Sequence, residues 1–224
     1  MGNVYFITAT GTDAGKTFVA EGLARAWRAR GRAVRALKPV MSGYDAAAPE
    51  RSDAGRLLAA CGLAPNAANV DAISPWRFKA PVSPDRAAVF EDRRMDFDDL
   101  LAWSRREVLR SEDAVLIEGI GGVMVPLDAH HTVREWIAAL ELPTLLVAGT
   151  YLGAISHTLS ALAALREVGV VPAAIVVNES PGGVSIEDML ASLAAHAGGI
   201  SLATISRGDA AVTALVQLLD SEQA

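Results

Sequence analysis

Residues 4–17 read VYFITATGTDAGKT, a short apolar run followed by a loop that ends in Gly15, Lys16 and Thr17. The run predicts a strand, and the apolar spacing that follows predicts a helix over residues 16–30. A loop between a strand and a helix directs backbone N–H groups and a helix N-terminus at phosphate oxygens. The lysine then reaches the outer phosphates, and the threonine hydroxyl contacts Mg²⁺. The stretch therefore predicts a site for ATP and Mg²⁺.

This phosphate loop is a variant of the common pattern. That pattern has a glycine five residues before Gly15, where this chain has Thr10. A Gly-Lys-Thr tripeptide also occurs by chance at the start of helices that bind no ligand. Its place after the first strand, with an acidic strand end further along the chain, favours nucleotide binding.

The rest of the chain alternates strand-like and helix-like segments, which indicates a parallel α/β fold. The apolar runs are continuous, as expected of strands covered on both faces. Strands are predicted at residues 4–8, 33–37, 114–118, 144–148, 174–178 and 200–205. Helices are predicted at residues 16–30, 54–61, 97–110, 133–140, 154–168, 186–197 and 209–219. Residues 44–52 and 74–85 are predicted as loops.

Three residues indicate where helices begin or end. Asp96 stands where an N-cap would open the third helix, and Gly31 and Gly169 follow the first and fifth helices as C-cap glycines. The predicted fold class is α/β of the P-loop NTPase type, a mainly parallel sheet with helices on both faces. With 224 residues, the chain suits a single domain over residues 1–224.

Composition and charge exclude several classes of protein. The net charge of −6 argues against broad capture of nucleic acid, which needs clustered lysine and arginine. The longest apolar stretches, such as residues 142–149, are too short to span a bilayer, so no membrane partner is expected. One cysteine, Cys61, excludes an intrachain disulfide and a multi-cysteine zinc site. The N-terminus lacks a signal-peptide pattern, so the cytoplasm is the expected compartment.

Two carboxylates are candidate ligands of Mg²⁺, which prefers oxygen ligands. Glu118 ends an apolar strand and precedes the glycine-rich residues 119–122, a Walker B-like arrangement at the edge where open α/β sheets bind ligands. The alternative is a glutamate facing solvent beside a flexible turn. Asp53 stands at the start of a helix, where a simple N-cap is the alternative. The adjacent His130 and His131 lack further ligands at helical spacing and are assigned to a solvated loop.

Lys38 ends the second predicted strand, so it lies at the same sheet edge as the phosphate loop. A lysine beside phosphates stabilises the charge that develops on a transferring phosphoryl group. The alternative is a surface lysine that caps the strand.

Six motifs in order resemble the dethiobiotin synthase family, and the resemblance spans residues 4–178. The motifs are Thr-x-x-Gly-Lys-Thr at residues 12–17, Lys-Pro-Val-x-Ser-Gly at 38–43, Ser-Asp-Ala at 52–54, Ala-Pro-x-Ser-Pro at 80–84, Glu-Gly-x-Gly-Gly at 118–122 and Leu-Gly-x-Ile-x-His at 152–157. Each motif alone is weak, because cobyrinate amidases and septum-positioning ATPases share the fold and a related loop. The ordered set favours this family.

The resemblance implies an ATP- and Mg²⁺-dependent ligase of biotin biosynthesis. It would close the ureido ring of dethiobiotin from 7,8-diaminononanoate (diaminopelargonate) and CO₂. One amine captures CO₂ as a carbamate, the carbamate attacks the γ-phosphoryl group, and the second amine displaces phosphate from the carbamic–phosphoric anhydride. Catalysis then consists mostly of positioning and charge neutralisation.

The resemblance also assigns roles to residues. Lys38 would be catalytic, stabilising the carbamate and the γ-phosphoryl group. The nucleotide and its metal would be bound by Asp13, Ala14, Gly15, Lys16, Thr17, Phe18, Asp53, Glu118, Gly119, Ile120, Gly121 and Asn178. Of these, the ligands of Mg²⁺ would be Thr17, Asp53 and Glu118. The diamine end of the substrate would contact Thr12 and Ser42. Its distal carboxylate would bind backbone amides near Leu152 and Gly153 from a partner subunit, which implies a homodimer.

The chain also departs from the family pattern. Ala9 stands where the family usually has glycine, and Ala14 stands where it has valine. Residues 200–208 lack the Gly-x-Ile-Pro turn that the family often places beside the adenine, which leaves Asn178 as the expected adenine contact. The main alternative, a ParA/MinD-like ATPase switch, carries an additional lysine at the position of Gly11. A cobalamin-synthesis amidase needs a glutaminase domain, for which the chain has no room.

Overall fold

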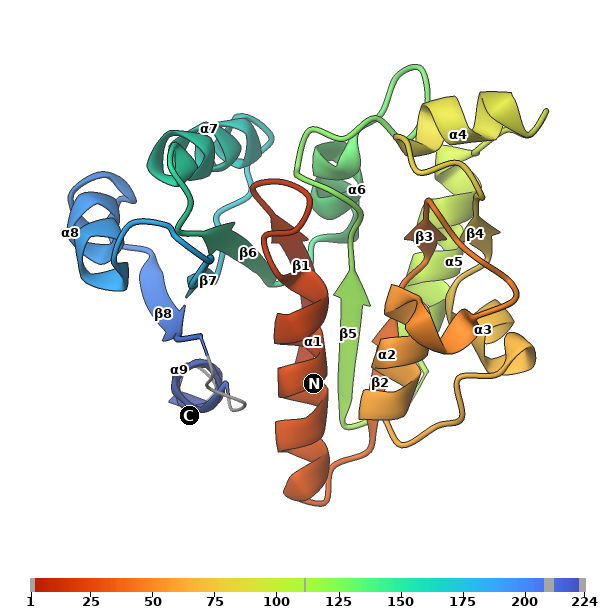
Figure 1. The fold of residues 1–224 in the computed structure, drawn as a ribbon, viewed down its shortest axis with the longest axis horizontal. Helices are drawn as coiled ribbons and strands as arrows, with labels where there is room; N and C mark the ends of the chain where they lie inside the picture. The colour runs from red at the N-terminus through yellow and green to blue at the C-terminus, as the bar shows by residue number, and fades with distance from the viewer. Residues whose placement is uncertain (1–2, 111, 208–211, 222–224) are drawn as a thin grey trace.

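A computed structural model describes residues 3–110, 112–207 and 212–221. In this part of the chain, a six-stranded sheet has the order β2-β5-β1-β6-β7-β8, and every neighbouring pair is parallel (Figure 1). Its strands are β1 (Asn3–Ala9), β2 (Val34–Leu37), β5 (Ala114–Glu118), β6 (Thr144–Gly149), β7 (Ala174–Asn178) and β8 (Ser201–Ile205). A separate pair joins β3 (Val40–Met41) to β4 (Trp76–Arg77).

The helices cover both faces of the large sheet. They are α1 (Lys16–Ala29), α2 (Asp53–Ala60), α3 (Ala67–Ile73), α4 (Pro84–Phe90), α5 (Phe97–Val108), α6 (Val133–Leu140), α7 (Ala154–Glu167), α8 (Ile186–His196) and α9 (Thr213–Ser221). Alternate residues of β1 enter two cores: Ile7 packs with α1 and α9, whereas Phe6 packs with α5 to α8. This two-sided burial explains why the strands are apolar without alternation.

The predicted α/β fold class is confirmed, and all six predicted strands lie within one residue of the observed ones. The caps at Asp96, Gly31 and Gly169 are also present: Asp96 accepts a hydrogen bond from the backbone N–H of Asp99, and both glycines have positive φ. The last helix begins at Thr213 in the described residues; the predicted start at Asp209, like Gly208, lies outside them.

The two predicted loops contain short elements that the sequence interpretation missed. A 3₁₀ turn (Pro49–Arg51) interrupts residues 44–52, and β4 and the start of α4 fall within residues 74–85. Closely spaced prolines predict a loop, but Pro84 stands in the first turn of α4, where its missing N–H costs nothing. α3 was also missed, because seven residues carry too little periodicity.

Parallel strands end at one edge, and this edge carries the polar residues that the sequence singled out. The loop after β1, Lys38 after β2, Glu118 at the end of β5 and Asn178 at the end of β7 all lie there. Among the described residues, no helix is long and apolar enough to cross a membrane.

Candidate active site

The phosphate loop joins β1 to α1 in a conformation that requires glycine at its end. Gly15 has φ of 103° and precedes the first residue of α1. A Cβ atom there would lie 2.1 Å from Nδ2 of Asn178, which donates a hydrogen bond of 3.0 Å to the carbonyl oxygen of Ala14. Asn178 thus braces the loop from the end of β7, and the N-terminus of α1 faces the cavity described below.

Lys16 is held over this loop. Its Nζ donates to the carbonyl oxygens of Gly121, at 2.8 Å, and Gly11, at 3.3 Å. Burial and the nearby charge of Lys38 lower the pKa of Lys16 to about 8, although Glu118, Asp53 and Asp13 oppose the shift. An anion beside this ammonium would favour its charged form.

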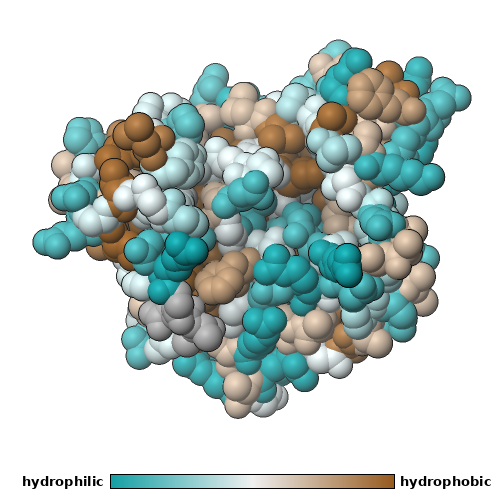
Figure 2. Space-filling model, viewed as in Figure 1, coloured by the Kyte–Doolittle hydropathy of each residue, from teal (hydrophilic) through white to brown (hydrophobic). Residues whose placement is uncertain are grey.

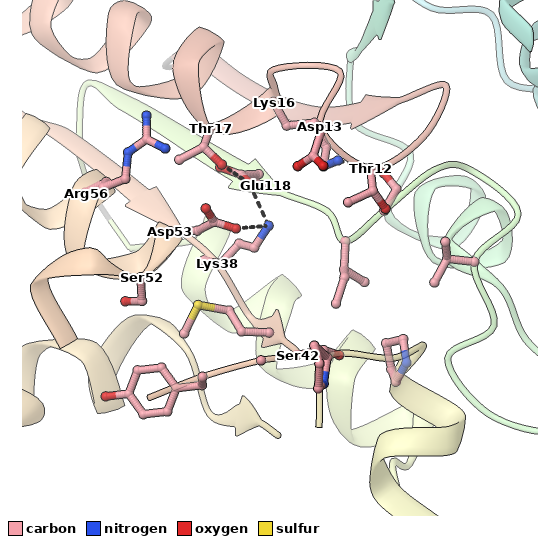
Figure 3. Close-up of a pocket in the computed structure, with 18 of the residues that line it drawn as sticks. Thr12, Asp13, Lys16, Thr17, Lys38, Ser42, Ser52, Asp53, Arg56 and Glu118 are labelled. Carbon is pink, nitrogen blue, oxygen red and sulfur yellow. Dashed lines mark hydrogen bonds and ion pairs between the residues drawn. The ribbon is translucent and has the colours of Figure 1, made fainter. Parts of the chain in front are cut away.

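Glu118 and Lys38 form a buried ion pair beside the loop (Figure 3). Nζ of Lys38 lies 2.6 Å from Oε1 of Glu118 and donates to the carbonyl oxygen of Gly119 at 2.8 Å. Thr17 donates its hydroxyl to the same Oε1 at 2.8 Å. The exposed fraction is 1% for Glu118 and 3% for Lys38, which excludes both the solvent-facing glutamate and the surface lysine.

Asp53 completes this cluster from the start of α2. Its Oδ2 lies 3.3 Å from Nζ of Lys38. The N-cap of α2 is Ser52, whose Oγ accepts from the backbone N–H of Gly55, so the alternative of Asp53 as a simple N-cap is wrong. Burial alone would raise the pKa of Asp53, but the charge and hydrogen bond of Lys38 and the nearby hydroxyl of Thr17 lower it. The carboxylate is therefore ionised at neutral pH.

The cluster fits a Mg²⁺ ion. Oε2 of Glu118 is buried and has no hydrogen-bond partner among the described residues, an arrangement that costs free energy unless a ligand satisfies it. Mg²⁺ takes one or two carboxylates together with phosphate and water oxygens. Thr17, Asp53 and Glu118 offer this donor set. Within the described residues, no group of three or more His, Cys, Asp or Glu side chains offers an all-protein metal site.

A cavity of about 730 Å³ opens over the cluster. Most of the residues predicted for the nucleotide and the metal line it, as do Thr12 and Ser42, which were predicted for the diamine. The nucleotide and metal residues in the lining are Asp13, Gly15, Lys16, Thr17, Phe18, Asp53, Glu118, Ile120 and Gly121. Within the part of the chain that the structure describes, the buried Oγ of Ser42 has no hydrogen-bond partner, so a polar group of a ligand would satisfy it. Pro81, Val82 and Val125 form an apolar part of the wall. The cavity thus joins a charged end to a partly apolar one.

The structure does not bring every predicted residue to this cavity. Ala14, Gly119 and Asn178 contribute contacts behind its wall rather than lining it. Leu152 and Gly153 line a different cavity of about 800 Å³ at the N-terminus of α7. His131 bonds to Asp128 and stacks on Phe97 in a loop, as the non-metal interpretation predicted.

Sequence reasoning missed several lining residues, among them Met41, Tyr44, Arg51, Ser52, Arg56, Ser83 and Val125. Ser52 belongs to the Ser-Asp-Ala motif at residues 52–54, and two others also had a usable signal. Arg56 follows Asp53 by three residues, a spacing that places both on one face of a helix. Ser83 belongs to the motif at residues 80–84, to which no role was assigned. Val125 follows the glycine-rich segment and had no distinguishing pattern.

The fold and the site define a P-loop nucleotide-binding protein. The AAA domain family model matches residues 3–207. The septum site-determining protein MinD from Pyrococcus horikoshii, in complex with Mg-ADP, superposes with a TM-score of 0.56 at 14% identity and covers 99% of this chain and 96% of its own. The hydrogenase maturation factor HypB from Archaeoglobus fulgidus superposes with a TM-score of 0.57 at 11% identity, and the match covers 99% of this chain and 89% of HypB. At such identities the likeness shows the fold alone.

Curated relatives identify one family within this class of nucleotide-binding proteins. An ATP-dependent dethiobiotin synthetase BioD from Acidiphilium cryptum is 52% identical over 87% of this chain and 88% of the relative. The synthetase from Methylobacterium nodulans is 45% identical over 91% of this chain and 92% of the relative. The synthetase from Phenylobacterium zucineum is 44% identical over 88% of this chain and 86% of the relative. The chain therefore belongs to the ATP-dependent dethiobiotin synthetase family, as its motifs predicted.

Proposed function

We propose that the chain uses ATP to close the ureido ring of dethiobiotin from 7,8-diaminononanoate and CO₂, releasing ADP and phosphate in biotin biosynthesis. The observation that supports this most directly is the ion-pair cluster at the charged end of the cavity, in which Lys38 and Glu118 are buried and Asp53 is partly exposed. A ligase that forms this mixed anhydride needs a cationic group, here Lys38, between the phosphoryl donor and the attacking carbamate oxygen.

In this proposal the phosphate loop binds the triphosphate. The backbone N–H groups at the start of α1 and the ammonium of Lys16 contact the outer phosphates. Thr17, Asp53 and Glu118 hold Mg²⁺, which neutralises charge on the phosphates when bound. Among the residues behind the wall, Asn178 and Gly119 position the loop and Lys38 through their hydrogen bonds.

Lys38 acts where the two substrates meet. Its ammonium contacts the carbamate oxygen as that oxygen attacks the γ-phosphoryl group, and it stabilises the charge that shifts between them. Thr12 and Ser42 contact the diamine end. The second amine then displaces phosphate from the anhydride and closes the ring. The partly apolar wall at Pro81 and Val125 limits the access of water, which would otherwise hydrolyse the anhydride.

The proposal includes a homodimer in the cytoplasm. Leu152 is 91% exposed, and Figure 2 shows apolar side chains gathered at the left of the view, over the region of α7 and α8. The N-cap of α7, Gly153, makes no side-chain capping hydrogen bond among the described residues, so the first turn of this helix suits a carboxylate. In a dimer, this helix end would complete the cavity of the partner by binding the distal carboxylate of the substrate.

Product formation tests the reaction. The protein is incubated with 7,8-diaminononanoate, ¹³C-labelled bicarbonate, Mg²⁺ and ATP, and dethiobiotin is measured by mass spectrometry. Label is expected in the ureido carbon, with no product when ATP or the diamine is left out. ATP hydrolysis that is independent of the diamine, with no dethiobiotin, would instead favour a ParA/MinD-like ATPase.

Mixing two variants tests the shared site. Lys38→Gln removes the catalytic ammonium, and Leu152→Asp places a negative charge where the substrate carboxylate is proposed to bind. Each variant alone should be inactive. Mixed dimers contain one cavity with both native residues, so activity should return on mixing. Two inactive variants that stay inactive after verified subunit exchange would contradict a shared site.

A further inference from the structure

Arg56 and Glu21 form an ion pair directly behind the metal cluster. Glu21 follows Thr17 by four residues on α1, and Arg56 follows Asp53 by three residues on α2, so each lies on the same helix face as the earlier residue. The helices thus bring together two layers, with Thr17 and Asp53 in the first and Glu21 and Arg56 in the second. In Figure 3, Arg56 lies next to Thr17, whereas Thr12 lies across the cavity.

The pair holds the guanidinium in one orientation. Nε of Arg56 donates to Oε1 of Glu21 at 2.9 Å, and Nη2 donates to Oε2 at 3.0 Å. This two-bond geometry fixes the plane of the guanidinium. Nη1 donates to no other described residue. The side chain of Arg56 is 44% exposed and lines the cavity, so the N–H groups of Nη1 are available to a ligand there.

Stability alone does not account for this pair. Glu21 is only 5% exposed, and a buried carboxylate loses hydration that an ion pair repays incompletely. An apolar contact between the same helices would serve packing equally well. Arg25, on the next turn of α1, also lies 3.8 Å from Glu21 but does not line the cavity. Glu21 therefore has one partner that faces the site and one that does not.

Charge points to the ligand of Arg56. The other charged residues that line the cavity are three cations and three carboxylates, namely Lys16, Lys38, Arg51, Asp13, Asp53 and Glu118. Their formal charges cancel, whereas the carboxylate that balances Arg56 lies behind the wall. Lys16 and Lys38 are already engaged by carbonyl and carboxylate oxygens. Arg56 is the cation in the described cavity that combines a fixed orientation with a free edge.

We infer that Arg56 binds the phosphate chain of the nucleotide from the metal side, and that Glu21 is a positioning residue that orients it. This inference rests on the proposed function, because it assumes Mg-ATP in the cavity. Phosphate oxygens suit the planar, charged N–H groups of arginine. The contact exists with the nucleotide before and during phosphoryl transfer, so it contributes to binding rather than to the chemical step.

The test compares Arg56→Gln, Glu21→Gln, the double variant and Arg25→Gln. Calorimetric titration with Mg-ATP should show a Kd about tenfold higher for Arg56→Gln, as expected for one charge-assisted contact. Glu21→Gln should raise it about threefold. Because Glu21 acts through Arg56, the double variant should match Arg56→Gln alone. Arg25→Gln removes the other partner of Glu21 and should bind like the parent.

Kinetics separate this role from a structural one. Arg56→Gln should raise KM for ATP with kcat nearly unchanged. The double variant leaves no unpaired carboxylate at position 21, so it keeps the test valid if Arg56→Gln is unstable. Binding by Arg56→Gln or the double variant within twofold of the parent would overturn the inference, as would an equal loss in Arg25→Gln. A parent protein that does not bind Mg-ATP would instead refute the proposed function.

Discussion

Two buried glutamates lie near opposite ends of strand β5 and have different surroundings. Glu107, on α5 beside the amino end of the strand, is bonded through both oxygens: Arg106 donates to Oε1, and Arg35 and Arg110 donate to Oε2. Glu118, at the carboxyl end, accepts from Thr17 and Lys38 through Oε1, and no described residue bonds to its Oε2.

The difference in hydrogen bonding distinguishes a structural carboxylate from one that has an oxygen available to a ligand. The arginines satisfy Glu107 completely, so packing and folding account for it. Burying Glu118 with a free oxygen costs stability that the fold does not recover. Such a cost is expected where a protein has been selected for binding or catalysis.

The largest contrast is expected between Glu118→Gln and Glu107→Gln in activity. The amide of glutamine cannot serve as an anionic oxygen ligand, so Glu118→Gln should lower kcat for dethiobiotin formation by about 10²–10³. Glu107→Gln should keep activity within about twofold, because it lies at the far end of the strand. Steady-state assays of both variants at saturating ATP check this, and equal losses would contradict the comparison.

A second, smaller effect is expected at Asp53. Asp53→Asn keeps the shape of the side chain but removes one hard anionic oxygen, so the Mg²⁺ concentration for half-maximal activity should rise about tenfold. The measurement is a Mg²⁺ titration at fixed ATP, with Asp45→Asn as a control on the preceding loop. A metal dependence identical to that of the parent would return Asp53 to a purely structural role.

The sequence predicted most of the fold and much of the site, for physical reasons that can be stated. Continuous apolar runs identify strands covered on both faces, and parallel strands that end at one edge bring together Lys38, Glu118 and the phosphate loop. The ion pair of Lys38 with Asp53 was not predictable from pattern alone, because it depends on how α2 packs on α1. For the same reason, the free edge of Arg56 and the unpartnered Oε2 of Glu118 emerged only from the structure.

The order of the two glutamate variants should reverse when the free energy of unfolding is measured instead of activity. Glu107→Gln leaves the three arginines without their shared carboxylate and should lower the free energy of unfolding by about 2 kcal/mol. This lies below the range for fully buried pairs because Arg106 and Arg110 remain largely in water. Glu118→Gln also removes a charge partner of the buried Lys38, but Asp53 remains 3.3 Å from Nζ of Lys38, and the substitution removes the buried anionic Oε2 that has no partner among the described residues. Its loss should therefore be smaller, about 1 kcal/mol. Urea unfolding at pH 7 measures both, and a larger loss for Glu118→Gln would contradict this assignment.

The smallest effect is the pH dependence of that stabilisation. Burial alone would raise the pKa of Glu107, but the hydrogen bond and charge of Arg35, with those of Arg106 and Arg110, lower it below the usual 4.5. A lowered pKa in the folded state stabilises the protein above the unfolded pKa and is lost as pH falls through the folded pKa. The stability difference between parent and Glu107→Gln should therefore be constant from pH 7 to about 5.5 and shrink below 4.5. A difference that grows on acidification would contradict the sign.

The central claim is that the cluster of Lys38, Asp53 and Glu118 serves a ligase reaction, and Lys38→Gln tests it most directly. The measurement is single-turnover phosphate release from Mg-ATP, with and without 7,8-diaminononanoate and bicarbonate, alongside the Kd for Mg-ATP. In the parent, the diamine and bicarbonate should stimulate release. In Lys38→Gln, the stimulated rate should fall about 10²–10³-fold while Kd changes by less than about threefold. A parent whose phosphate release ignores the diamine, or a variant that loses binding and turnover equally, would contradict the account.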